Sequence, residues 1–270
     1  MMRIFLLSAL ACGLFTSLLP AHDTWVETNT SIVRKGELVH VDLKLGNHGN
    51  AHRDFKLASK IALDKCEVSV IAPDGKSTDM QPKMVDTGYT PKEGYWSGRF
   101  VTRSEGLYVV AQTCESKHGT TRGIKSAKTF FVASQKLDAV PEDLAGFDKP
   151  LGHPYEIVPL VNPVTAMGPG QPIRVRVLYE GKPVPEARVS FIPRGVQLAE
   201  GFDQAYEQLS DKEGVATFTP SEGNVYLIVN HHHADDQKGE GYDKTHYSAA
   251  LTIAVPQLCP HCIKALTTQK

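Results

Sequence analysis

The sequence has no surplus of charge of either sign. Its 29 Lys and Arg residues nearly balance 30 Asp and Glu residues, which gives a formal net charge of −1. Proteins that hold nucleic acids or anionic lipid surfaces do so through a basic field, and this composition does not supply one. We therefore expect no nucleic-acid partner.

Long apolar runs are also missing, except at the start of the chain. Residues 1–21, "MMRIFLLSALACGLFTSLLPA", contain one Arg, then an apolar stretch, then a small residue, which is the order of a secretory signal peptide. No later segment approaches the roughly 18 consecutive apolar residues of a membrane-spanning helix. We expect cleavage after Ala21, in preference to a lipid anchor at Cys12. The mature protein is then periplasmic or secreted and is not inserted in a membrane.

Recognisable catalytic motifs are absent from the sequence. It contains no G-x-S-x-G, no H-E-x-x-H and no phosphate-binding loop. The sequence therefore predicts no catalytic residue, and an enzymatic activity has no specific motif behind it.

No long amphipathic helix is predicted for the mature chain, because the regular segments alternate with a period of two. In "ELVHVDLKL" the apolar residues from Val39 to Leu45 alternate with polar ones, as in a half-buried strand. Similar strands recur through residues 22–133 and again through residues 153–256. The fold class predicted is all-β, with two tandem antiparallel β-sandwiches of immunoglobulin-like and prealbumin-like type.

The expected domain boundaries follow the breaks in this alternation. The segment at 134–152 is rich in Pro, Gly and acidic residues and is predicted to be a linker. The tail at 257–270, "QLCPHCIKALTTQK" in its sequence, follows the last strand. Because residues 153–256 carry a full set of strands, we expect the second sandwich to fold by itself.

Cysteines are few, and four follow the expected cleavage site: Cys66, Cys114, Cys259 and Cys262. An even number in an oxidising compartment favours disulfides. Cys66 and Cys114 lie in separate strands of the first sandwich, and we predict a disulfide between them. Cys259 and Cys262 form a "CPHC" motif without the βαβ pattern of a thioredoxin-like enzyme. They are expected to form a small tail disulfide or, with His261, a metal-binding hook.

Histidines, in contrast, are abundant, and the first of them has a special position. Cleavage after Ala21 makes His22 the N-terminal residue, so that its α-amine and imidazole can chelate one metal ion. One further imidazole would complete a T-shaped copper site. The alternative is that His22 merely begins the first strand.

A second group of histidines lies in "NHHHADDQKGEGYDKTHY". If the flanking strands pair as a hairpin, His231, His232 and His233 meet His246 at one end, beside Asp235 and Asp236 in the connecting loop. Because side chains alternate between the two faces of a strand, His231 is predicted to continue the core-facing row of Leu227 and Val229, and His232 to lie on the other face. Imidazoles with carboxylates suit nickel, cobalt or copper, and zinc is possible. A solvated loop with incidental histidines is the alternative. His48, His52 and His118 are weaker candidates.

The blocks "GHPYEIVPLVNP", "RVRVLYEGKPV", "SDKEGVATF", "YLIVNHH" and "YSAALTIAV" resemble a bacterial periplasmic family, as does the opening "AHDTWVE". That family is labelled cobalt or nickel transport system periplasmic component, and most of its members are uncharacterised. The resemblance implies a prealbumin-like second domain, a divalent metal and, as partner, a membrane transporter component. The chain departs from the family in its denser "HHHADD" run and its "CPHC" tail.

Three functions remain open from the sequence. The first is a periplasmic protein that binds a divalent transition metal through His22 and some of His231, His232, His233 and His246. The second is a structural or adhesive double sandwich whose histidines are incidental. The third is a copper oxidase built on His22, which would need a tyrosine such as Tyr226 or Tyr247 near the ion.

Overall fold

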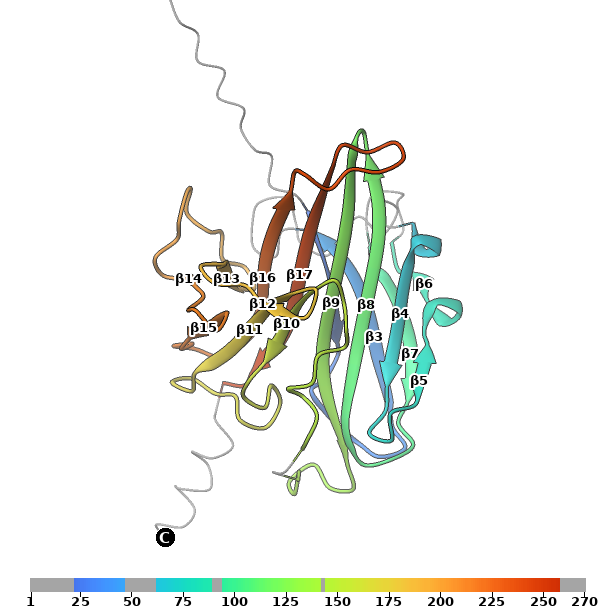
Figure 1. Cartoon of the computed structure of the whole chain (residues 1–270). Helices are drawn as coiled ribbons and strands as arrows, with labels where there is room; N and C mark the ends of the chain where they lie inside the picture. The colour runs from blue at the N-terminus through green and yellow to red at the C-terminus, as the bar shows by residue number, and fades with distance from the viewer. Residues whose placement is uncertain (1–21, 47–61, 89–93, 142–143, 258–270) are drawn as a thin grey trace, which may run out of the picture.

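The computed structural model describes residues 22–46, 62–88, 94–141 and 144–257, which are almost entirely strands and turns (Figure 1). The predicted all-β sandwich class is confirmed. The expected signal peptide and the tail from residue 258 onward lie outside the described residues. Within the described part of the chain, no helix is long and apolar enough to cross a membrane.

The N-terminal sheet has four strands in the order β1-β3-β7-β6. Every neighbouring pair is antiparallel, and β1 pairs with β3 so that Val26 faces Leu43. The strand bounds are β1 (Asp23–Thr28), β3 (Leu38–Gly46), β6 (Val85–Asp86) and β7 (Trp96–Val101).

The central sheet runs in the order β14-β13-β16-β17-β9-β8-β4-β5, and β2 pairs with β9 beside this path. Its longest strands form two hairpins, β8–β9 and β16–β17, which lie side by side (Figure 1). The bounds are β2 (Ile32–Arg34), β4 (Cys66–Ile71), β5 (Ser77–Asp79), β8 (Gly106–His118), β9 (Thr121–Ser134), β13 (Arg188–Pro193), β14 (Glu207–Leu209), β16 (Asn224–Ala234) and β17 (Lys244–Val255).

The third sheet belongs to the second half of the chain. Strand β11 is at its centre and pairs with β10, β12 and β15. The bounds are β10 (Tyr155–Pro159), β11 (Ile173–Tyr179), β12 (Lys182–Pro183) and β15 (Val215–Phe218). Two short 3₁₀ turns, Leu63–Lys65 and Gln81–Lys83, flank β4 and β5.

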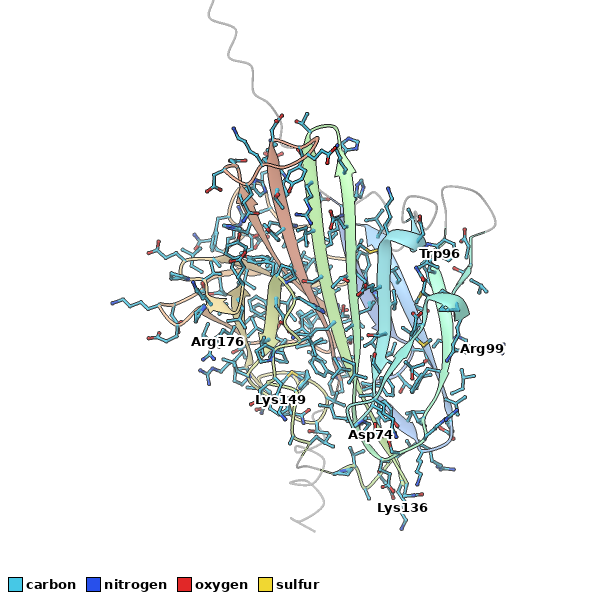
Figure 2. All side chains as sticks on the ribbon, turned by 45° about the vertical axis from the view of Figure 1, so that its right-hand side comes forward. Asp74, Trp96, Arg99, Lys136, Lys149 and Arg176 are labelled. Carbon is cyan, nitrogen blue, oxygen red and sulfur yellow. A yellow bond between two sulfur atoms is a disulfide. The ribbon has the colours of Figure 1, made fainter. Side chains whose placement is uncertain are left out.

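Both faces of the central sheet are buried, so the protein has three layers. Because side chains alternate along a strand, β16 sends Tyr226 and Ile228 into one core, while Leu227 and Val229 enter the other. The N-terminal sheet covers one face and the third sheet covers the opposite one. Exposed charges such as Arg99, Lys136 and Lys149 lie around the outside (Figure 2).

The two strand sets expected to form tandem sandwiches share this central sheet. Strand β17 pairs in parallel with β9, from Lys244 opposite Thr121 to Thr252 opposite Thr129. Neither core is built from one half alone, since Leu107, Phe130 and Val132 enter the core of the second half. The alternation predicts most of the longer strands but carries no information about which strand edges meet.

Two buried ion pairs join the layers. Lys128 of β9 donates to Glu156 of β10 over 2.5 Å, and both side chains are only 2% exposed. Glu156 also accepts hydrogen bonds from the backbone of Leu151 and Gly152. The pair therefore fixes the segment that leads into β10 against the central sheet.

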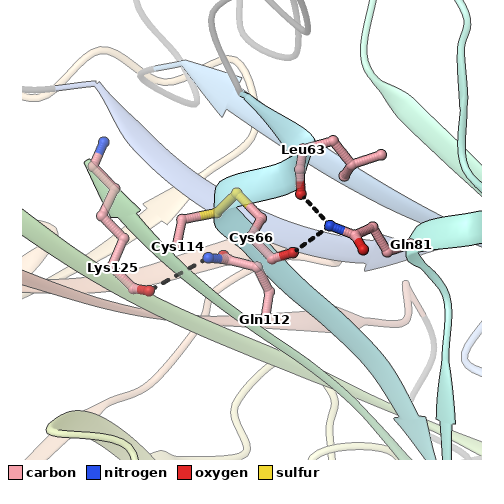
Figure 3. The surroundings of a disulfide bond; sticks show 6 residues. All are labelled: Leu63, Cys66, Gln81, Gln112, Cys114 and Lys125. Carbon is pink, nitrogen blue, oxygen red and sulfur yellow. Dashed lines mark hydrogen bonds between the residues drawn. A yellow bond between two sulfur atoms is a disulfide. The ribbon is translucent and has the colours of Figure 1, made fainter. Parts of the chain in front are cut away.

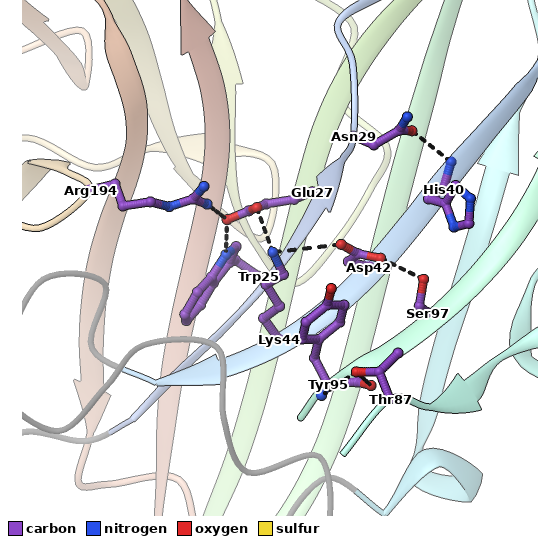
Figure 4. Close-up of polar contacts among 10 residues, drawn as sticks. All are labelled: Trp25, Glu27, Asn29, His40, Asp42, Lys44, Thr87, Tyr95, Ser97 and Arg194. Atoms are coloured by element: carbon purple, nitrogen blue, oxygen red, sulfur yellow. Dashed lines mark hydrogen bonds and ion pairs between the residues drawn. The ribbon is translucent and has the colours of Figure 1, made fainter. Parts of the chain in front are cut away.

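The second ion pair connects the two halves of the chain through β1. Glu27 accepts hydrogen bonds from Trp25, from Lys44 at 2.7 Å and from Arg194, which follows β13 (Figure 4). Burial alone would raise the pKa of Glu27, but Lys44 and Arg194 outweigh it and lower the pKa to about 2. Removing one partner of such a buried pair leaves an uncompensated charge.

The shared sheet predicts that residues 153–256 will not keep the stability of the whole chain when expressed alone. The fragment would expose Leu227 and Val229, which the N-terminal sheet covers, and would leave the edge of β17 unpaired. Each such apolar side chain contributes about 1.5–3 kcal/mol on burial. Urea unfolding of the fragment and of the full chain measures the difference. Equal midpoints would show that the halves are independent.

Acid should lower the free energy of unfolding of the protein through protonation of Glu27. Its pKa is lower in the folded than in the unfolded state, so its contribution is present above about pH 4.5 and is lost as the pH falls toward about 2. We expect the free energy of unfolding of Glu27→Gln to depend less on pH in this window, and to be lower than that of the wild type at pH 7. Chemical denaturation at several pH values measures both. Parallel pH profiles would contradict the assignment.

Candidate functional site

Polar side chains continue the core-facing row of β16 and β17 beyond the end of the apolar core. After Leu227 and Val229, the alternation places His231 and His233 on the same face. The predicted hairpin is present, with His231 opposite Ser248 and His233 opposite His246. We refer to His231, His233, His246 and Ser248 as the histidine face.

His231 is bound to the first strand of the protein. Its Nε2 lies 2.7 Å from Oδ1 of Asp23, and the hydroxyl of Ser248 donates to the same oxygen over 2.9 Å. Burial by itself raises the pKa of Asp23, but the charges of His231 and Lys125 and these hydrogen bonds outweigh it, so the pKa lies below its usual value. In return, the charge of Asp23 raises the pKa of His231.

His22 is held next to this ion pair by the central sheet. The ammonium group of Lys125, on β9, donates to the backbone carbonyl of His22 over 2.6 Å. Lys125 lies opposite Ser248 across the parallel pair of strands. Burial lowers the pKa of Lys125, and Asp23 opposes that shift. The expected first residue of the mature chain is thereby fixed at the histidine face.

His233 and His246 form a stacked pair. Their ring centroids are 4.0 Å apart and the rings are inclined by 12°. The Nε2 atom of His246 is buried and has no hydrogen-bond partner within the described structure. Burial lowers the pKa of both rings, and the neighbouring histidines lower it further. Neutral imidazoles with an unoccupied nitrogen are the form that binds transition metals.

His232 is on the opposite face, as its parity predicts. Its ring contacts those of Tyr155, Tyr179 and Tyr247, with a centroid distance of 4.8 Å to Tyr179. Gln237 joins two of these tyrosines by hydrogen bonds to their hydroxyl groups. The structure therefore separates His232 from the other histidines, and the three tyrosines surround it instead.

The remaining candidates are not brought into the same group. His118 is exposed at the end of β8, and Asp235 and Asp236 are exposed in the turn that follows β16. His48 and His52 lie outside the described residues, as do Cys259 and Cys262. Among the side chains that the structure describes, no three His, Cys, Asp or Glu residues are grouped closely enough to hold one metal ion. Metal binding at the histidine face thus requires rings such as those of His233 and His246 to turn toward a centre shared with their neighbours.

The predicted disulfide between Cys66 and Cys114 is confirmed, with a Cα–Cα distance of 4.1 Å. It links β4 to β8, and Gln81 donates to the carbonyls of Leu63 and Cys66 beside it (Figure 3). Cys114 lies opposite Lys125. One transverse row of the central sheet therefore runs from the disulfide through Lys125 and Ser248 to His231.

Three residues of this site were missed by sequence reasoning: Asp23, Lys125 and Ser248. Asp23 is part of the "AHD" opening, which is the only local signal for any of them. Lys125 and Ser248 look like ordinary polar positions in strands. Their role follows from the pairing of β17 with β9 and from the position of β1 over these strands.

The fold and this site define an all-β protein in which two sandwich cores share a central sheet and the N-terminal strand is bound to a histidine-rich hairpin. The chain matches the family model described as "Domain of unknown function (DUF4198)" over residues 19–234, and it belongs to that family. No curated protein matches the chain.

The solved structures that this chain resembles include three of low sequence identity. A DUF4785 family protein from Legionella pneumophila is 12% identical with a TM-score of 0.29, and the match covers 76% of this chain and 52% of that one. Salmonella alpha-2-macroglobulin is 12% identical with a TM-score of 0.25, and the match covers 87% of this chain and 15% of that one. The chain thus spans about half of the Legionella protein and a small part of the second. Murine CEACAM1b is 9% identical, with coverage of 87% and 98% and a TM-score of 0.22.

The electrostatics of the histidine face predict different titration midpoints for its rings. We expect His233 and His246 to titrate below pH 6.5 because they are desolvated, and His231 to titrate above pH 6.5 because of Asp23. Asp23→Asn should lower the His231 midpoint and leave His233 nearly unchanged. NMR titration of the imidazole resonances measures all three. A common midpoint would contradict the arrangement.

Proposed function

We propose that this protein captures a divalent transition-metal ion, nickel, cobalt or copper, at the histidine face, using the N-terminal residue His22 together with imidazoles of β16 and β17. The proposal includes export and cleavage after Ala21. Only cleavage at that bond gives His22 a free α-amine.

One observation carries this proposal: the start of the described chain is fastened to the histidine face by two contacts. Asp23 binds His231 over 2.7 Å, and Lys125 binds the carbonyl of His22 over 2.6 Å. The residue that would become the N-terminus therefore lies at the end of the sheet where His231, His233 and His246 are gathered. If His22 had no role at this face, neither of these two contacts would be required for it.

The donor set suits a borderline transition metal. The amine and ring of His22 form a chelate, and the neutral rings of His233 and His246 supply further nitrogen atoms. Nitrogen-rich sites favour copper, nickel, cobalt and zinc over calcium or magnesium, which prefer oxygen. The free Nε2 of His246 offers a ligand atom whose use breaks no existing hydrogen bond.

The resemblance to the family labelled cobalt or nickel transport system periplasmic component favours a role in metal supply. In that role the protein takes up the ion outside the inner membrane and passes it to a membrane transporter component. Its binding must then be reversible, so that a nearby partner can compete for the ion.

The proposal predicts that metal affinity depends on the free N-terminus. Adding one Met before His22 blocks the amine, and we expect it to weaken copper(II) or nickel(II) binding about as much as His22→Ala, by roughly tenfold or more. His233→Ala and His246→Ala should also weaken binding. Isothermal titration calorimetry with protein that begins at His22 gives the dissociation constants.

His40→Ala is the matched control, because His40 is an exposed strand histidine on β3 that is not part of the histidine face. It should bind the metal as the wild type does. Equal affinities for the native and the extended protein would refute the role of His22. The metal, if bound at all, would then depend on other residues.

A further inference from the structure

We infer that Asp23 is a positioning residue of this metal site: it holds the ring of His231 through Nε2, so that His231 ligates the ion through Nδ1. This inference rests on the proposed function and adds to it the ligating atom and the residue that selects it. Asp23 itself does not contact the ion in this arrangement.

The hydrogen-bond pattern determines which nitrogen is available. Oδ1 of Asp23 accepts the hydroxyl hydrogen of Ser248 and also faces Nε2 of His231. A carboxylate has no hydrogen to donate, so the hydrogen of this second contact is on Nε2. In the neutral ring the lone pair is then on Nδ1. Within the described structure, Nδ1 of His231 has no hydrogen-bond partner.

The fold holds Asp23 at its position independently of His231. Asp23 is 7% exposed, begins β1 and is paired with Gly46 of β3. The side chain of His231 is 42% exposed, whereas that of Asp23, which Nε2 of His231 contacts, is 10% exposed. An ion from solvent can therefore reach the ring of His231 while Asp23 stays bound to Nε2.

Asp23 also links His231 to the proposed chelate of His22. It is the residue next to His22 in the chain, and consecutive Cα atoms are about 3.8 Å apart. The same residue therefore fixes the ring of His231 and the position of the N-terminal chelate. In known metal sites a carboxylate behind a ligating histidine fixes its tautomer, and losing such a partner typically weakens affinity by about 10–100-fold.

The test uses the mature full-length protein with ¹⁵N-labelled histidine and zinc(II) as a diamagnetic probe. Long-range ¹H–¹⁵N spectra at pH 8 report which ring nitrogen carries the hydrogen. In the wild type we expect His231 to be the Nε2–H tautomer, and zinc to shift its Nδ1 resonance. Asp23→Asn retains an oxygen that accepts from Nε2, and should keep this tautomer and an affinity within about threefold. Asp23→Ala should give a mixture of tautomers and at least tenfold weaker binding.

The outcomes separate this inference from the proposed function. If zinc, copper(II) and nickel(II) shift no histidine and release no heat, the metal-binding function itself fails. If zinc binds but shifts Nε2 of His231, or if Asp23→Ala keeps both tautomer and affinity, the role of Asp23 is refuted while the function stands. Should Asp23→Ala fail to fold, the wild-type spectra decide, because an Nε2–H tautomer with the zinc shift at Nδ1 supports the inference. A wild-type ring in the Nδ1–H form overturns the inference without any variant.

Discussion

The parallel pairing of β17 with β9 is the contact on which the rest of the structure depends. It joins the strands of the second half to those of the first, so that one sheet has a buried face toward each half. Without it, Leu227, Val229 and Ala250 would lose the layer that covers them. Antiparallel hairpins can form from neighbouring segments, whereas this parallel pair requires both halves to be in place first.

The same pairing joins the histidine face, which the β16–β17 hairpin forms, to the first half of the chain. It sets Ser248 opposite Lys125, and Lys125 in turn holds the carbonyl of His22. Strand β1 then lies over β9 and β17, which brings Asp23 within hydrogen-bond distance of His231. His22 and the histidines of β16 and β17, which we propose as metal ligands, are therefore close because the sheet is continuous.

Buried charge reinforces this arrangement in the places where layers or halves meet. Lys128 and Glu156 join the central sheet to β10, and Glu27 joins β1 to Arg194. Such pairs contribute little net stability compared with apolar residues, but they penalise any alternative packing in which one charge is buried alone. A position of the layers that separated these charges would therefore be disfavoured.

The sequence by itself predicted most of the longer strands, the opposite faces of His231 and His232, and the disulfide between Cys66 and Cys114. Strands and the faces of their side chains follow from alternation, which is a local property of the sequence. The disulfide follows from two cysteines in separate strands of a protein expected in an oxidising compartment. The sequence also identified His22 and the hairpin histidines as unusual. Only the tertiary structure decided that the two strand sets share a sheet, that Tyr155, Tyr179 and Tyr247 surround His232, and that Asp23, Lys125 and Ser248 belong to the site. The shared sheet depends on the edge-to-edge pairing of β9 with β17, and the surroundings of His232 and the contact of Asp23 with His231 depend on packing between sheets. Hydrophobic periodicity carries no signal for either kind of contact.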